Sequence, residues 1–140
     1  MRRFAFRAWN SKKNEWQHKE PCDILGEMIL LGGWMNHVSI RDLNEIVIMQ
    51  FTGLRDKNGK EIYEGDLVNV KWNDGLIDNE TIAEVIFIKG CFCCDDKKRN
   101  DFLFHSHMRF EVIGNVFDNP ELIQKKDAPQ KSAEAVVNSI

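Results

Sequence analysis

The sequence predicts a mostly β fold: a small, partly open, SH3-like β-barrel with an N-terminal hairpin, a variable insertion and a short C-terminal helical turn. Two observations between Met49 and Trp72 favour this class. First, two turns rich in Gly, Asn and Asp divide the stretch into short apolar segments, as turns between strands do. Second, residues 67–72 alternate between two faces, and a period of two is typical of a half-buried strand.

Both turns are located by the chemistry of their residues. The first, Asp56–Gly59, contains Asn and Gly, which tolerate positive φ and let the chain reverse. A four-residue loop of this kind is commonly a type I turn closed by a Gly bulge. In the second turn, Glu64–Asp66, we expect the Asp66 carboxylate to accept backbone N–H groups freed at the corner. Gly59 and Gly65 are therefore predicted to have positive φ angles.

The segments before these turns predict three strands. Residues 3–9 alternate and predict a first strand, residues 10–14 form a polar turn, and residues 15–18 predict a returning strand, which gives an N-terminal hairpin. Residues 45–51 are rich in β-branched side chains and predict a buried strand.

The segments after the turns complete the predicted sheet. Residues 80–90 predict a long strand, residues 91–107 a hairpin with a charged tip at Lys97–Arg99, and residues 108–117 a closing strand. Gly114 inside the closing strand indicates a bulge or a close backbone approach. Five apolar residues are expected to be mostly buried in these strands: Val68, Val70, Ile86, Val112 and Ile113.

The chain is predicted to form one β domain over residues 1–123. The Asn-Pro step at Asn119 is a helix-start signal and predicts the short helical turn that closes the domain. Residues 20–44 form the predicted variable insertion, and its apolar stretch Met28–Trp34 favours an exposed contact surface. Residues 124–140 are polar and rich in small side chains, which predicts a disordered tail.

Composition excludes some classes of protein. The chain has 140 residues, 43% of them hydrophobic, which is enough for a buried core. A formal net charge of -3 argues against a general nucleic-acid binder. No apolar stretch approaches the ~18 residues that span a bilayer, and the N-terminus lacks the features of a signal peptide. We therefore expect a cytoplasmic protein with its four cysteines mostly reduced.

Three sequence blocks resemble a known family. They are "FRAW" near the N-terminus, "MQFTGLRDKNGKEIYEGDLV" in the centre and "FEVIGNVFDNPEL" near the C-terminus. In this order and approximate spacing they resemble the YopX family of bacteriophage and prophage proteins. The resemblance implies a mostly β fold with an SH3-like barrel and a phage origin. The cytoplasm in which we expect the protein is then that of a bacterial host cell. It implies no mechanism, because the family has no established catalytic or binding residues that could be carried over.

The best candidate for a metal site is the set Cys91, Cys93, His105 and His107. Zinc takes four such ligands in a tetrahedron, and pairing within the predicted hairpin would bring the two cysteines opposite the two histidines. The spacing differs from the usual C-x2-C of zinc knuckles. The alternative is that Cys91 and Cys93 are small buried hydrophobic residues and that the histidines lie at the surface.

The candidate nucleic-acid-binding residues are Arg3, Arg7, Lys12 and Lys13, which make the N-terminal hairpin basic. Tryptophans interleave with basic residues in this chain, and such faces can stack nucleobases. The alternative is a charged edge strand that discourages aggregation, with the tryptophans closing the ends of the core.

The function predicted from these observations is a non-enzymatic accessory or adaptor domain without a cofactor, whose partner is another protein or a second copy of itself. No catalytic residues are identified, because the sequence contains no nucleophile elbow, P-loop or dinucleotide-binding motif. A nucleic-acid-binding SH3-like barrel is the alternative function. A zinc-stabilised module is the second alternative.

Overall fold

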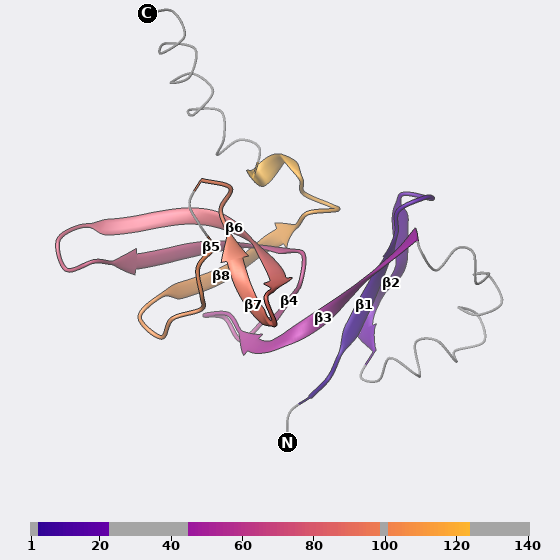
Figure 1. The fold of residues 1–140 in the computed structure, drawn as a ribbon, viewed down its shortest axis with the longest axis horizontal. Helices are drawn as coiled ribbons and strands as arrows, with labels where there is room; N and C mark the ends of the chain where they lie inside the picture. The colour runs from indigo at the N-terminus through magenta and orange to yellow at the C-terminus, as the bar shows by residue number, and fades with distance from the viewer. Residues whose placement is uncertain (1–2, 23–44, 99–100, 124–140) are drawn as a thin grey trace, which may run out of the picture. The chain divides into compact units, whose positions relative to one another are not determined.

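The computed structural model describes residues 3–22, 45–98 and 101–123 and confirms a mostly β fold (Figure 1). Eight strands, all paired antiparallel where their registers are given, account for most of these residues. The chain divides into two compact units, Met1–Leu54 and Arg55–Ile140. The single domain over 1–123 and its SH3-like character stay predictions. No helix within the described segments is long and apolar enough to cross a membrane.

The first unit contains the predicted N-terminal hairpin. Its strands are β1 (Phe6–Asn10), β2 (Glu15–Cys22) and β3 (Ile46–Arg55), in the order β2-β1-β3. The turn between β1 and β2 is held by Asn10, whose Oδ1 accepts the N–H groups of Lys12 and Lys13 at 3.1 and 3.0 Å. This side chain satisfies backbone donors that the reversal leaves without a strand partner.

The predicted buried strand at 45–51 is only partly buried, which corrects the prediction. Met49 and Phe51 are buried, but Val47 and Ile48 are 38% and 37% exposed. Because neighbouring residues of a strand point to opposite faces, neither face is fully covered at that end of β3. A high content of β-branched residues predicts a strand, but it does not predict which part of that strand is buried by other elements.

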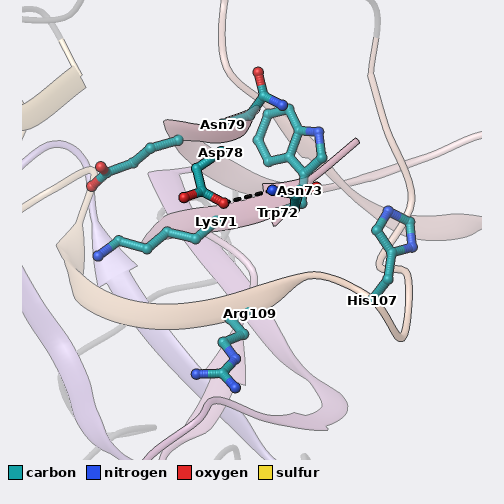
Figure 2. Close-up of a pocket in the computed structure, with 8 residues that line it drawn as sticks. Lys71, Trp72, Asn73, Asp78, Asn79, His107 and Arg109 are labelled. Atoms are coloured by element: carbon teal, nitrogen blue, oxygen red, sulfur yellow. Dashed lines mark hydrogen bonds between the residues drawn. The ribbon is translucent and has the colours of Figure 1, made fainter. Parts of the chain in front are cut away.

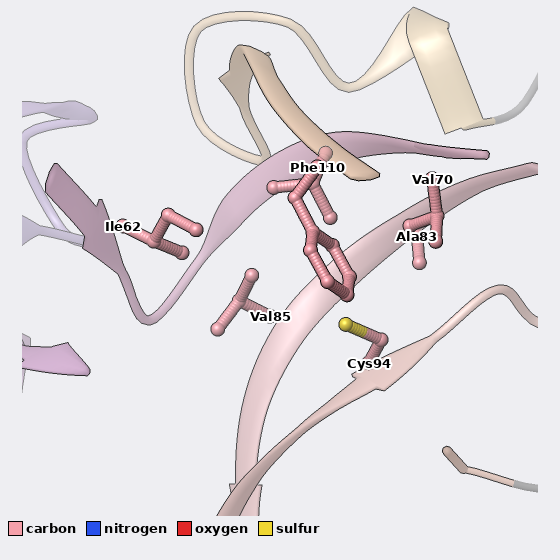
Figure 3. Close-up of a cluster of buried hydrophobic side chains, with 7 residues drawn as sticks. Ile62, Val70, Ala83, Val85, Cys94 and Phe110 are labelled. Atoms are coloured by element: carbon pink, nitrogen blue, oxygen red, sulfur yellow. The ribbon is translucent and has the colours of Figure 1, made fainter. Parts of the chain in front are cut away.

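The second unit contains β4 (Glu61–Tyr63) and a four-stranded sheet in the order β7-β6-β5-β8. A cluster of buried side chains forms its core, and Figure 3 shows that Cys94 faces Phe110 within this cluster. Val68 and Val70 are buried as predicted, whereas the other three residues expected to be buried, Ile86, Val112 and Ile113, are partly exposed. The sheet strands are β5 (Asp66–Asn73), β6 (Asp78–Ile88), β7 (Cys91–Asp95) and β8 (Arg109–Asn115). The core cluster consists of Ile62, Val68, Val70, Ala83, Val85, Cys94 and Phe110.

Both predicted glycine turns are confirmed. Gly59 and Gly65 have φ angles of 83° and 82°, in the left-handed region that other residues rarely adopt. At the second turn the Asp66 Oδ2 accepts the N–H of Tyr63 at 2.8 Å, as expected for a carboxylate at a corner. The N–H of Gly65 donates to the carbonyl of Val85 at 2.8 Å, which ties this corner to β6.

The buried carboxylate of Asp56 connects the first turn to the far end of the chain. Its Oδ1 accepts the N–H groups of Asn58 and Lys60, both at 2.9 Å. Its Oδ2 accepts the N–H of Val112 in β8, also at 2.9 Å, across 56 positions of sequence. The N–H of Lys57 adds a bond to the carbonyl of Phe110 at 2.9 Å. The turn therefore covers backbone groups at the edge of β8.

Gly114 has both features that its position indicated. The register of β5 and β8 shifts there, since Leu67 lies opposite Gly114 while Val68 lies opposite Val112, which leaves Ile113 in a bulge. The backbone of Gly114 also closely approaches the side chain of Asn119, where an added Cβ would lie 2.7 Å from Cγ.

The predicted C-terminal helix start is present. Residues 121–123 are helical at the end of the described chain, and the N–H of Leu122 donates to the Asn119 carbonyl at 3.1 Å. The Oδ1 of Asn119 accepts the N–H of Asn115 at 3.3 Å, so this carboxamide also serves the end of β8.

Some predictions concern residues outside the described segments. Of the insertion at 20–44, residues 20–22 belong to β2 and the rest is outside, including the apolar stretch Met28–Trp34. The tail at 124–140 and Arg99 at the predicted hairpin tip also lie outside the description.

Replacing Asp56 should strongly destabilise the protein. Asp56→Ala leaves three backbone N–H groups without their acceptor, and we expect a loss of about 3 kcal/mol in the free energy of unfolding. Asp56→Asn keeps one carbonyl oxygen and should lose about half as much. Urea unfolding near neutral pH measures both losses. A matched control is Glu15→Gln, which removes the charge of an exposed carboxylate. An equal effect of this control would contradict the assignment.

The same carboxylate should make stability depend on pH. Burial raises the pKa of Asp56, but the N–H donors of Val112, Lys60 and Asn58 outweigh burial and hold the pKa below its ordinary 3.8. Its stabilisation is therefore complete above that value and is lost as the pH falls through the lowered pKa. The difference in unfolding free energy between the parent and Asp56→Asn should shrink below pH ~4. A difference that grows on acidification would have the wrong sign.

Gly114→Ala should also destabilise the protein, because the added methyl group meets the Asn119 side chain. We expect a cost of about 1–3 kcal/mol, typical of overpacking. Adding Asn119→Ala removes the atoms closest to the new methyl group. In a double-mutant cycle by chemical denaturation, the pair should cost less than the sum of the single changes. Additive losses would show that the two positions are not in steric contact.

Candidate functional site

The tip of the β5–β6 hairpin presents the most exposed apolar side chain among the described residues. Leu76 is 91% exposed and its neighbour Ile77 is 62% exposed. Both lie in the loop between Asn73 and Asp78, the last residue pair of the β5–β6 ladder. Loops of this length are normally polar, so two adjacent aliphatic residues at a tip indicate a contact surface.

Polar side chains of the loop accept hydrogen bonds from the backbone of the tip. Asp74 Oδ1 accepts the N–H groups of Leu76 and Ile77 at 2.9 and 3.0 Å, and its Oδ2 accepts a bond from Asn79 Nδ2 at 3.3 Å. The N–H donors of Ile77 and Leu76, followed by Asn79, lower the pKa of Asp74 below 3.8. The Oδ1 of Asn73 accepts the N–H of Gly75 at 2.7 Å. The aliphatic side chains are thus displayed on an ordered loop.

A pocket of about 550 Å³ lies at the base of this hairpin (Figure 2). Its walls come from β5, β6 and the start of β8. Figure 2 shows the Trp72 indole beside Asn79, with His107 across the pocket from the indole. The lining consists of Lys71–Asn73, Asp78–Glu80, His107 and Arg109.

Basic and acidic side chains lie next to each other in the pocket. Lys71 lies in the middle of the sheet, directly opposite Glu80 in β6 and Arg109 in β8. The carboxylates of Asp78 and Glu80 accept amide N–H bonds from Asn73 and Asn69, at 2.8 and 2.9 Å. Among the described residues, neither Lys71 nor Arg109 forms an ion pair. Lys71 therefore lies between an acidic and a basic cross-strand neighbour, Glu80 and Arg109.

The ladders on the two sides of β5 differ in length. β5 pairs with β6 as far as Asn73, but its ladder with β8 ends at Lys71 and Arg109. A turn closed by the Met108 N–H and the His105 carbonyl, 3.0 Å apart, precedes β8. The β5–β6 hairpin therefore extends past the first residue of β8.

The predicted zinc ligands do not form a metal site in the described structure. His105 and His107 stack on each other, with ring centroids 5.4 Å apart. Cys93 is buried, whereas Cys91 is exposed and donates to the Ile88 carbonyl at 3.5 Å. No group of three or more His, Cys, Asp or Glu side chains among the described residues is placed to hold a metal. The four side chains thus do not fit zinc as they lie, and no chemistry is assigned to them.

The basic residues of the N-terminal hairpin contact aromatic and acidic groups of their own unit. The guanidinium of Arg7 lies 5.3 Å from the centroid of the Trp16 ring, and that of Arg3 lies 5.9 Å from the Phe51 ring. Lys12 pairs with Glu45 at 3.8 Å. These contacts give Arg3, Arg7 and Lys12 a structural role within their own unit. The binding of nucleic acid by the four candidate residues stays a prediction.

Sequence reasoning did not identify the hairpin tip or the pocket. Residues 73–79 contain the turn-forming residues Asn, Asp and Gly, and the two adjacent aliphatic residues among them were the available signal. The pocket joins Trp72 to His107, which are far apart in the chain. Only the strand order and register bring them together, and a local pattern does not contain that information.

Comparisons with known proteins agree with the fold. The family model described as YopX protein matches residues 5–124. The crystal structure of protein EF1440 from Enterococcus faecalis is similar at a TM-score of 0.50 and 22% identity, covering 86% of this chain and 97% of that one. The crystal structure of protein YopX from Bacillus subtilis is similar at a TM-score of 0.51 and 21% identity, covering 84% of this chain and 96% of that one. No curated protein is a significant match.

The three described free cysteines should differ sharply in reactivity. Cys91 is exposed, while burial raises the pKa of the Cys93 thiol and raises that of Cys94 to about 12. In a Cys22→Ser background, a thiol reagent near pH ~8 should label Cys91 fast, and label Cys93 and Cys94 only after denaturation. Mass spectrometry of the labelled peptides measures this order. Fast labelling of native Cys94 would contradict its buried position.

Proposed function

This chain belongs to the YopX family, and we propose that it acts as a non-enzymatic protein-binding domain that contacts its partner through the β5–β6 hairpin. The observation that carries the proposal is the hydrogen-bonded tip with Leu76 and Ile77 exposed on it. The proposal concerns this chain and does not extend to other members of the family.

The hydrogen bonds to Asp74 support a binding role because they reduce the entropic cost of association. A mobile loop loses conformational freedom when a partner immobilises it, and that loss opposes binding. Here the backbone of Leu76 and Ile77 is already fixed by the Asp74 carboxylate. Burial of these two side chains in a partner's pocket could then contribute about 2 kcal/mol each to binding.

The other exposed apolar groups of the second unit are weaker candidates. Phe87 packs edge to face on Phe92, with ring centroids 5.0 Å apart, so part of its surface is already used. Leu103 is 50% exposed but stands alone in sequence between two partly buried aromatic residues. Ile88, the neighbour of Phe87, is 39% exposed. Leu76 and Ile77 differ from all of these in lying in a turn and in being the most exposed.

The partner is either a different protein or a second copy of this chain. These two cases differ in a simple observable, because self-association through the hairpin would give a concentration-dependent mass of the purified protein. Light scattering after gel filtration separates them. In both cases the same two side chains carry the contact.

Replacing both tip residues should abolish partner binding without unfolding the protein. We expect Leu76→Ser with Ile77→Ser to lower partner recovery at least about tenfold, since it removes the apolar anchor of the contact. Tagged parent and variant are compared by quantitative mass spectrometry in cells that naturally produce the protein, together with a photo-crosslinking residue at position 76. Circular dichroism should be unchanged, because Asp74 bonds the backbone of the tip.

The matched control is Leu103→Ser, an exposed leucine outside the hairpin. It should retain the partner, and a crosslinker at position 103 should give no product with it. If the double variant and the parent recover the same proteins, or if the parent captures and crosslinks nothing above background, the hairpin is not the contact surface.

A further inference from the structure

The turn that Asp56 organises contains a chemically reactive step of the chain. Asn58–Gly59 is the only Asn-Gly step in the sequence. Asparagine is thermolabile, because its side-chain amide can react with the backbone nitrogen of the next residue. Glycine has no Cβ, so a following glycine offers the least steric hindrance to this approach. The inference drawn from this step is independent of the proposed binding function.

The reacting groups of this step are accessible. Asn58 and Gly59 are both exposed, and a Cβ built on Gly59 would meet no atom within 4 Å. Within the described part of the chain, the Asn58 carboxamide forms no hydrogen bond. The side-chain oxygens of Asn10 and Asn115, in contrast, each accept two backbone N–H groups. Asn58 thus combines a favourable neighbour with an amide that no other group holds in place.

Folding restrains the nucleophile rather than the amide. The N–H of Gly59 donates to the Asp56 carbonyl at 2.9 Å. On either side of it, the N–H groups of Asn58 and Lys60 donate to the Asp56 Oδ1, both at 2.9 Å. For attack, the Gly59 nitrogen must lose its proton and turn toward the Asn58 side chain. The hydrogen bond of Gly59 therefore has to break before the reaction can occur.

We propose that Asn58 is a site of spontaneous deamidation whose rate is set by opening of the Asp56 turn. The deprotonated Gly59 nitrogen attacks the Asn58 Cγ, and a C–N bond forms. The bond from Cγ to Nδ2 breaks, and the side-chain nitrogen takes up the proton and leaves as ammonia. Water then hydrolyses the cyclic imide at one of its two carbonyls, which gives aspartate or isoaspartate at position 58.

The products act on the contact that joins this turn to β8. An isoaspartyl link adds a methylene group to the backbone between the nitrogens of residues 58 and 60, whose N–H groups share one oxygen of Asp56. Both products also place a negative charge beside the Asp56 carboxylate. Deamidation thus weakens the turn and, through Asp56, its bond to the N–H of Val112.

The step Asp74–Gly75 provides a comparison within the same chain. Its carboxylate accepts the N–H groups of Leu76 and Ile77, which hold the pKa of Asp74 below 3.8. An ionised carboxylate is a poor electrophile, so Asp74 forms a cyclic imide far more slowly than the neutral amide of Asn58. Modification is therefore expected at the Asp56 turn and not at the hairpin tip.

Incubation of the full-length protein near neutral pH tests the proposal. Mass spectrometry with electron-transfer fragmentation locates each converted residue and separates aspartate from isoaspartate. In guanidinium chloride, Asn58 should convert before any other asparagine. In native buffer its conversion should be at least about tenfold slower, because it proceeds only from the opened turn. Asn58→Gln should remove the signal in both conditions.

A variant of the turn and a variant of the core separate local opening from global unfolding. Asp56→Asn keeps one carbonyl oxygen and should remain folded, yet it should speed native conversion of Asn58 at least about fivefold. The matched control is Val85→Ala, which removes buried methyl groups of the core cluster and leaves the turn intact. It should speed the conversion less than Asp56→Asn does.

Three results would overturn the proposal: equal rates in native buffer and in guanidinium chloride, earlier conversion of another asparagine, or equal acceleration by Val85→Ala. The isoaspartyl form, separated by ion exchange, should unfold at a lower urea concentration than the parent. An unchanged midpoint would overturn the coupling of position 58 to β8.

Discussion

The carboxylate of Asp56 is the interaction on which much of the second unit depends. It accepts backbone N–H groups from both sides of its own turn and from Val112 in β8. Backbone N–H and C=O groups at a sheet edge either form hydrogen bonds within the protein or remain available to water and to other chains. A single side chain thus shapes the turn, fixes where β8 lies against it and covers part of that edge. Within the turn, Asn58 donates its N–H to this carboxylate, and Gly59 donates to the backbone carbonyl of Asp56 at 2.9 Å.

Local structure could be predicted from the sequence where a residue's own chemistry decides it. Gly59 and Gly65 take positive φ because only residues without a Cβ penalty do so easily, and Asp66 accepts a backbone N–H at its corner. Gly114 shows both the bulge and the close approach that a glycine inside a strand indicates. Each of these features depends either on residues within a few positions of one another in the sequence or on a backbone conformation that glycine adopts far more easily than other residues.

Long-range structure could not be predicted from the same patterns. Asp56 was interpreted only as part of a turn, because the partner N–H of Val112 lies 56 residues away. The candidate zinc ligands Cys91 and Cys93 alternate correctly for one face of a strand, yet one is exposed and the other buried. Period-two alternation reports which residues share a face, but not where a neighbouring segment ends. The pocket was missed for the same reason, since its lining combines residues of β5 and β6 with His107 and Arg109.

The fold and the proposed site are therefore linked through β8. The N–H of Lys57 and the carboxylate of Asp56 hold Phe110 and Val112, and Arg109 is the residue directly before this anchored stretch. A two-stranded ribbon alone is marginally stable, so the projecting β5–β6 hairpin relies on a third strand at its base. Fixing the start of β8 sets both how far the hairpin projects and where Arg109 stands beside Lys71. Loss of the Asp56 contact would then act on the hairpin by releasing the start of β8, which pairs with β5 at Lys71.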